Sequence, residues 1–73
     1  MKVIRTAEFQ AGEVHRLSDD VAEVYVRSGK AWLTMPNEDL LLSTGEFAIF
    51  FPDDHDIVLS SLGDKPLVVE ELG

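Results

Sequence analysis

Turn-forming residues interrupt this sequence at short, fairly regular intervals, and their spacing restricts the possible folds more than any other feature. The breaks fall at Gly12 and at residues 18–20, 28–29, 36–39, 44–45, 52–56 and 63–66. Most segments between two breaks are about five to seven residues long, which is the length of a strand and too short for most helices. No segment shows apolar residues at helical spacing over a useful window. The sequence therefore predicts a domain built almost wholly from β-strands.

The predicted strands follow one another without room for crossover helices between them. They cover residues 2–5, 13–17, 21–27, 30–35, 40–43, 46–51, 57–62 and 67–72. We therefore expect an all-β fold in which about six to eight short antiparallel strands form a small barrel or sandwich. Because 73 residues can enclose one hydrophobic core at most, residues 1–73 are predicted to be a single domain.

The composition argues against several kinds of partner. The chain has 14 acidic and 6 basic residues and a formal net charge of −8, and the basic residues are scattered along it. Nucleic acids and anionic membranes need basic side chains gathered on one surface, so we expect neither as a partner. The chain has no cysteine, which excludes disulfides and thiolate metal sites and agrees with a reducing compartment. Since no export signal or long apolar stretch is evident, we expect a cytoplasmic location.

Alternation within the predicted strands indicates which side chains are buried. Trp32 is the only large apolar side chain on the polar face of residues 30–35. Residues 46–51 are apolar on both faces, and we assign Phe47 and Ile49 to the interior. The predicted core consists of Val24, Val26, Ala31, Leu33, Leu40, Leu42, Phe47, Ile49 and Leu59.

Tyr25, Trp32 and Phe50 lie on the faces opposite the predicted core. Two interpretations remain open: they form an outward apolar patch between subunits, or they lie in a second internal layer under the N-terminal strand or a long turn. A domain of about 70 residues usually needs a disulfide, a metal or a partner subunit to gain stability. We therefore predict a symmetric homodimer, formed through a surface that includes Trp32 with Tyr25 or Phe50.

Two short motifs connect the chain with a known family. Residues 26–34 read Val-Arg-Ser-Gly-Lys-Ala-Trp-Leu-Thr, and residues 42–46 read Leu-Ser-Thr-Gly-Glu. They resemble a family of short, uncharacterised bacterial cupin-like proteins, a domain of unknown function with a small-residue-Gly-basic-x-Trp-apolar-Thr hairpin and a later Gly-Glu turn. Gly-Glu at residues 12–13 and Arg-Leu at residues 16–17 extend the resemblance over most of the chain. The resemblance implies a reduced cupin barrel and no established reaction.

A second, shorter resemblance covers residues 47–55, which read Phe-Ala-Ile-Phe-Phe-Pro-Asp-Asp-His. This segment is similar to one in the sugar-handling cupins related to the beta subunit of evolved β-galactosidase. In those proteins a histidine that follows the Phe-Phe-Pro turn is a site residue. Here His55 falls one place early and Asp56 occupies the expected position. We therefore attribute the similarity to the shared sequence pattern of a cupin turn.

Metal-binding cupins use several histidines and a glutamate, because these side chains hold a divalent ion while leaving a position open for substrate. This chain has two histidines, and the candidate ligands are Glu13, His15, Glu23 and His55. Glu13 stands where the first histidine of the cupin pattern belongs, and Glu23 shares a strand face with Tyr25 rather than with the predicted core. We therefore expect two surface histidines and neither a metal nor another cofactor.

The remaining polar residues match no catalytic pattern. The aspartates of residues 53–56 follow a proline, as tight turns favour, and the acidic pairs at residues 19–20, 38–39 and 70–71 are predicted to be solvated. The serines lack the strand-turn-helix elbow of a nucleophile, and the isolated glycines form no phosphate-binding loop. No catalytic residue is predicted.

Two functions from different classes therefore remain. The first is a non-enzymatic binding or assembly domain that acts as a homo-oligomer. The second is a minimal cupin that binds a metal ion or a small, sugar-like ligand in the barrel through His15, His55 and nearby carboxylates. The missing ligands, the short chain and the bulky apolar residues that could fill the barrel favour the first. Nothing in the sequence identifies a small-molecule ligand.

Overall fold

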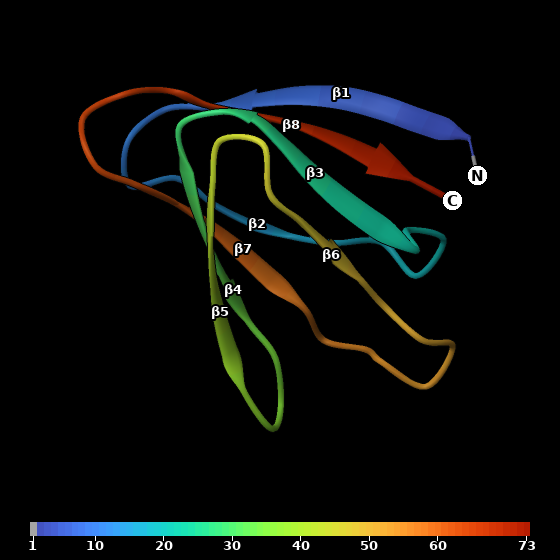
Figure 1. The fold of residues 1–73 in the computed structure, drawn as a ribbon. Helices are drawn as coiled ribbons and strands as arrows, with labels where there is room; N and C mark the ends of the chain where they lie inside the picture. Colours follow the sequence, from blue (N-terminus) through green and yellow to red (C-terminus); the bar gives the residue numbers. More distant parts are fainter. Residues whose placement is uncertain (1) are drawn as a thin grey trace.

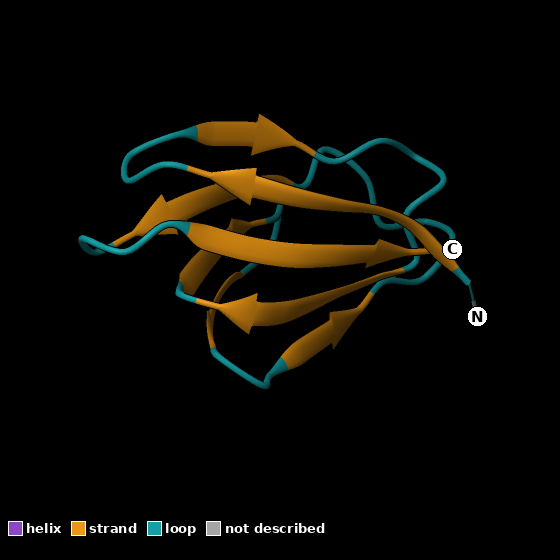
Figure 2. Cartoon of the chain, turned by 90° about the horizontal axis from the view of Figure 1, so that it is seen from above, coloured by secondary structure: helices purple, strands orange, loops and turns teal. Residues whose placement is uncertain are grey.

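The computed structural model describes residues 2–73, which form eight strands and no helix (Figures 1 and 2). Among these residues there is consequently no helix that could cross a membrane. The strands are β1 (Val3–Phe9), β2 (Val14–Arg16), β3 (Glu23–Ser28), β4 (Lys30–Thr34), β5 (Asp39–Ser43), β6 (Phe47–Ile49), β7 (Val58–Leu62) and β8 (Leu67–Leu72). The predicted all-β fold is confirmed.

The strands form two four-stranded sheets, and every pairing is antiparallel. Sheet A has the order β1-β8-β3-β6, and sheet B has the order β2-β7-β4-β5. Figure 1 shows β1, β8 and β3 side by side, with β7, β4 and β5 grouped below them. The result is a sandwich rather than a closed barrel, because the strand order leaves two free edges in each sheet.

The pairing is nested: β1 pairs with β8, β2 with β7, β3 with β6, and β4 with β5. The chain thus resembles one long hairpin folded over on itself, which is the arrangement of a jelly roll. The two ends of the chain meet, since the backbone N–H groups of Lys2 and Gly73 each donate to the carbonyl of the other at 2.9 and 2.8 Å.

The chain passes from sheet A to sheet B between β3 and β4, where Gly29 has a φ of +90°. A Cβ atom at this position would lie 2.6 Å from the carbonyl oxygen of Pro66 and 3.0 Å from the Cα of Leu67. Glycine is therefore required here for two reasons, the left-handed conformation and the close approach of the β7–β8 turn.

The core lies between the sheets and forms one continuous cluster. Of the predicted core, Val24, Val26, Ala31, Leu33, Leu42 and Leu59 are buried, and Leu40 is half-buried against them. The cluster also contains buried residues that alternation did not select, namely Leu17, Val21, Ala48, Phe50, Ile57, Leu67 and Val69.

The assignment of β6 was wrong, because the predicted core residues Phe47 and Ile49 are 55% and 52% exposed, whereas Phe50 is 7% exposed. The cause is the pairing with β3, in which Ala48 lies opposite the buried Val24, and Phe47 lies opposite Tyr25. Opposed residues on antiparallel strands point to the same side of the sheet. Both faces of this segment are apolar, so its own alternation could not select the inner one.

Two phenylalanines near β6 provide a direct test of this orientation. We expect Phe50→Ala to lower the free energy of unfolding by about 3–5 kcal/mol, because it leaves a cavity in the core. Phe47→Ala should lower it by about 1 kcal/mol or less, because most of that ring is already in water. Urea denaturation of both variants measures the difference, and an equal loss in the two would contradict the orientation of β6.

Gly29 and Gly45 form a second matched pair, since both have φ near +90° but only Gly29 faces nearby backbone. Gly45→Ala should cost about 1–2 kcal/mol through the left-handed conformation alone. Gly29→Ala should cost about 1–3 kcal/mol more, because the methyl group displaces the backbone at Pro66. Thermal unfolding of the two variants distinguishes these contributions, and similar melting temperatures would show that the β7–β8 turn does not contact Gly29.

Candidate functional site

The four candidate metal ligands lie in separate places. The Glu13 carboxylate accepts a hydrogen bond from the Gln10 backbone N–H at 2.7 Å, and Glu23 begins β3 opposite Ile49. His15 is in the middle of β2, and His55 lies in the exposed loop before β7. Within residues 2–73 no group of three or more histidine, cysteine or acidic side chains is placed to hold a metal. The candidate ligand set is therefore not assembled.

Glu71 is fully buried, so the prediction of a solvated acidic pair at residues 70–71 was wrong for this residue. The reason is its position in β8, which lies between β1 and β3 in sheet A. In the strand register Glu71 lies opposite Arg5 of β1 and opposite the buried Val24 of β3, so the Glu71 side chain points to the inner side of the sheet. Glu70 points outward and accepts a hydrogen bond from Arg27 at 2.8 Å.

The buried carboxylate is contacted by one cation and one imidazole. Arg5 Nη1 donates to Glu71 Oε1, and His15 Nε2 lies 3.5 Å from Glu71 Oε2. Neither His15 Nε2 nor Glu71 Oε2 has a hydrogen-bond partner. The His15 ring is stacked on Phe9, with their centroids 5.1 Å apart. The prediction of a surface position for His15 was therefore only partly right, because its ring edge reaches the interior.

Arg5 connects this carboxylate with the surface. Its Nη1 also donates to Ser18 Oγ at 3.2 Å, and its Nη2 lies 3.8 Å from Asp20 Oδ2. The Ser18 hydroxyl, which donates to Asp20 at 2.6 Å, lowers the pKa of the Asp20 carboxyl, and the Arg5 charge adds to this effect. This group, Arg5, His15, Ser18, Asp20 and Glu71, is called the Glu71 cluster below. Within this cluster the Arg5 guanidinium offsets the charge of the buried Glu71 carboxylate.

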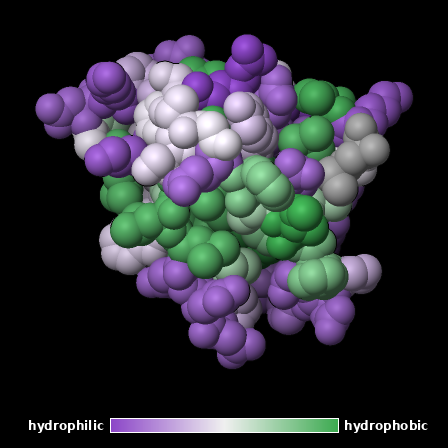
Figure 3. All heavy atoms as spheres, viewed as in Figure 1, coloured by the Kyte–Doolittle hydropathy of each residue, from purple (hydrophilic) through white to green (hydrophobic). Residues whose placement is uncertain are grey.

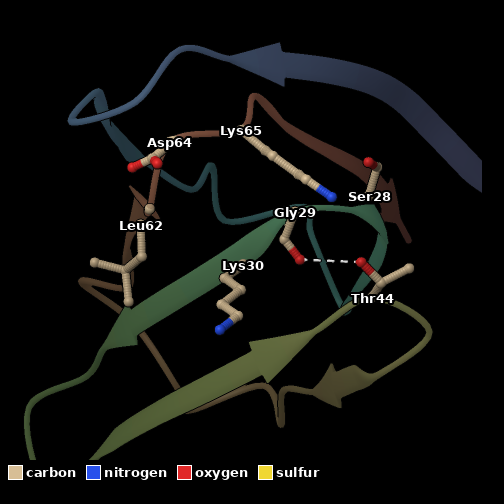
Figure 4. Close-up of a pocket in the computed structure, with 8 residues that line it drawn as sticks. Ser28, Gly29, Lys30, Thr44, Leu62, Asp64 and Lys65 are labelled. Atoms are coloured by element: carbon tan, nitrogen blue, oxygen red, sulfur yellow. Dashed lines mark hydrogen bonds between the residues drawn. The ribbon is translucent and has the colours of Figure 1, made fainter.

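A cavity of about 390 Å³ lies at one end of the sandwich, where three turns meet (Figure 4). The Thr44 hydroxyl donates to the Gly29 carbonyl at 3.1 Å and ties two of these turns together. In Figure 4, Lys65 extends toward Ser28, whereas the Lys30 ammonium points away from it. The cavity is lined by Ser28, Gly29, Lys30, Thr44, Leu62, Gly63, Asp64 and Lys65. Because its polar side chains are exposed, it is a surface hollow without a buried recognition group.

His55 borders a second cavity, of about 230 Å³, between the β4–β5 turn and the loop before β7. Its Nδ1 lies 2.9 Å from the Asp53 carbonyl oxygen. This hydrogen bond, and then the nearby Asp56 carboxylate, raise the pKa of His55 above its ordinary value. His55 therefore interacts with its own loop, and among the described residues it has no hydrogen bond or ion pair with His15 or Glu71.

The outer face of sheet B carries a row of side chains that crosses all four strands and is apolar except at its β7 member, Ser60. The strand register places Val14 of β2 beside Ser60 of β7, Ser60 beside Trp32 of β4, and Trp32 beside Leu41 of β5. Val14, Trp32 and Leu41 are 67%, 40% and 69% exposed. These four residues are called the Trp32 row. Separately, Figure 3 shows apolar side chains gathered in a band across the middle of the face seen in Figure 1.

The structure corrects the predicted composition of the apolar patch. Phe50 is buried in the core and cannot join an outer surface, because the register of β6 turns it inward. Tyr25 lies on β3 of sheet A, whereas Trp32 lies on β4 of sheet B, so the two are not neighbours in one sheet. Nor does the N-terminal strand cover Trp32, since β1 is an edge strand of sheet A. Val14 and Leu41, the actual neighbours, become evident only from the strand register.

No protein family and no curated protein matches the chain. Among solved structures, the chain is similar to a conserved protein of unknown function from Streptococcus pyogenes, with a TM-score of 0.64 and 19% sequence identity. The match covers 93% of this chain and 61% of that protein. The chain thus spans less than two thirds of its structural neighbour, and the similarity shows the fold alone.

Arg5 and Glu71 provide a test of the buried ion pair. Arg5→Met should lower the free energy of unfolding, because it leaves the buried Glu71 charge without a cation. Since Arg5 is partly exposed to water, we expect a loss below the about 3–5 kcal/mol that breaking a fully buried pair costs. The double variant Arg5→Met/Glu71→Leu should recover most of this loss. Urea denaturation gives the coupling between the two sites, and strictly additive effects would contradict the pairing.

Proposed function

We propose that this chain is a cupin-like assembly domain, without catalytic activity, which self-associates through the outer face of sheet B. The observation that carries the proposal is the Trp32 row, in which the apolar side chains of Val14, Trp32 and Leu41 are all exposed. Large apolar surfaces on small soluble domains commonly mark interaction sites. The occupant we propose is a second copy of the chain.

The cupin-like part of the proposal is supported by two independent features. The nested pairing of eight strands in two sheets is the jelly-roll arrangement that cupins use. The motif at residues 26–34 also coincides with the crossing from sheet A to sheet B, where Gly29 is required and Trp32 emerges on the outer face. The motif residues that resemble the cupin-like family thus have definite structural roles.

The non-enzymatic part is supported by the interior. In a ligand-binding barrel the space between the sheets is hollow, whereas here a continuous cluster of apolar side chains fills it. The charged residues that do reach the interior, Arg5 and Glu71, are paired with each other. The Arg5 charge is therefore already balanced by a carboxylate of the same chain.

Self-association would compensate for the small size of the core. Burial of Trp32, Val14 and Leu41 from both copies removes apolar surface worth roughly 25 cal/mol per Å², against which the loss of rotational and translational freedom must be set. Repulsion between two chains of net charge −8 opposes pairing, but salt screens exposed charges over about 8–10 Å. We therefore expect a dimer that strengthens with moderate salt.

The second function, a metal or small-ligand site, has one observation in its favour. His15 Nε2 and Glu71 Oε2 face each other at 3.5 Å and neither has a hydrogen-bond partner. Two such atoms could be partial ligands of a divalent ion. Metal analysis of protein purified without an affinity tag distinguishes this function, because it requires stoichiometric metal that is lost in His15→Ala.

Self-association is tested by light scattering coupled to size exclusion at high micromolar concentration. We expect the parent to have twice the monomer mass and Trp32→Ser to shift toward the monomer, because each substitution removes two contacts of a symmetric interface. Phe47→Ser is the control, since Phe47 is an exposed apolar residue of the other sheet. A parent that remains monomeric at low and moderate salt would overturn the proposed function.

A further inference from the structure

We infer that the two copies pair face to face about a two-fold axis parallel to the strands of sheet B, so that Arg16 lies over the partner's Asp39. This inference rests on the proposed self-association and specifies its geometry. It is carried by the arrangement of the few charges on the outer face of sheet B.

A second row crosses this face beside the Trp32 row. It places Arg16 of β2 beside Val58 of β7, Val58 beside Thr34 of β4, and Thr34 beside Asp39 of β5. Arg16 and Asp39 are both exposed and lie on the two edge strands, at the same level along the sheet. This row therefore carries a positive charge at one edge and a negative charge at the other.

The outward strand positions of this face contain few of the chain's acidic residues. Its charged residues are Arg16, Lys30 and Asp39, two positive charges and one negative, which gives a net charge of +1 against −8 for the whole chain. Arg16 also contacts Asp56 in its own chain, yet its side chain remains mostly exposed and has further donors. The strand positions of this face thus bring one acidic residue of each copy, Asp39, into the contact.

Symmetry then decides how the two faces combine. An axis parallel to the strands places β2 over the partner's β5 and keeps every residue at its own level. Val14 then lies over the partner's Leu41, Arg16 lies over the partner's Asp39, and both contacts occur twice. The two sheets pack with their strands roughly aligned, as in β-sandwiches.

The alternative axis, perpendicular to the strands, also joins the apolar residues but places no two opposite charges directly over each other, since Lys30 lies over the partner's Thr34, one strand away from the partner's Asp39. It places β2 over the partner's β2 and reverses the levels, so that Val14 meets the partner's Val14. Arg16 then lies at the level of the partner's Gly12, which has no side chain to receive it. Electrostatic complementarity therefore favours the axis parallel to the strands, because complementary charges fix the register of an interface.

Charge exchange tests this geometry directly. In Arg16→Asp and in Asp39→Arg, each homodimer would bring two pairs of like charges together, and we expect its Kd to rise on the order of ten-fold or more. A one-to-one mixture of the two variants should form a heterodimer with an affinity near that of the parent, because both contacts are again between opposite charges. The double variant Arg16→Asp/Asp39→Arg should recover the homodimer.

Lys30→Asp is the matched control, since it changes the net charge as much as Arg16→Asp does but lies over the partner's Leu62 in this geometry. Its mixture with Asp39→Arg should show no preference for the heterodimer. Sedimentation velocity with one variant fluorescently labelled measures both mixtures, and circular dichroism confirms that each variant is folded. If Arg16→Asp does not fold because it places a second carboxylate beside Asp56, Arg16→Gln, which adds no charge there, should instead relieve the repulsion in Asp39→Arg.

The outcomes separate the two proposals. A parent that does not self-associate overturns the proposed function and this inference with it. A dimer whose Kd is unchanged by Asp39→Arg and by Arg16→Asp, with no preference for the heterodimer, overturns the axis and leaves self-association in place.

Discussion

The structure depends on antiparallel pairing between strands that are far apart in the sequence. The first strand pairs with the last, and each later strand pairs with one closer to the middle, so only the β4–β5 pair is local. Contacts of this kind are established only after long loops have closed, which makes such folds slow to form and strongly cooperative. The same pairing fixes which face of every strand is buried.

One consequence of this pairing is a charge in the core. β8 lies between β1 and β3, and its inward positions are Leu67, Val69 and Glu71. A buried carboxylate is tolerated because Arg5 is its register partner on β1 and reaches from the surface with its long side chain. The ion pair does not add much stability by itself, but its loss from one side leaves an uncompensated charge.

A second consequence is the separation of the molecule into faces of different character. Sheet B presents the Trp32 row with few charges beside it, whereas most acidic residues lie in loops, at the other sheet or at strand ends. A chain with 14 acidic residues can therefore have one face with few negative charges. Neither the cavity at the three turns nor the loop of His55 offers a comparably built site.

The sequence by itself determined the approximate limits of most strands, because turn residues mark strand ends locally, but β1 extends to Phe9, well beyond its predicted end at Arg5. It also determined the inner face of β3 and β4, where one face is polar, but left open whether Trp32 lies on the surface or in a second internal layer. The tertiary structure alone decided the inner face of β6 and the burial of Glu71, since a strand that is apolar on both faces, or acidic at its end, takes its orientation from its partners. Only the register across four strands placed Val14 and Leu41 beside Trp32, because alternation acts within a strand and pairing acts between strands.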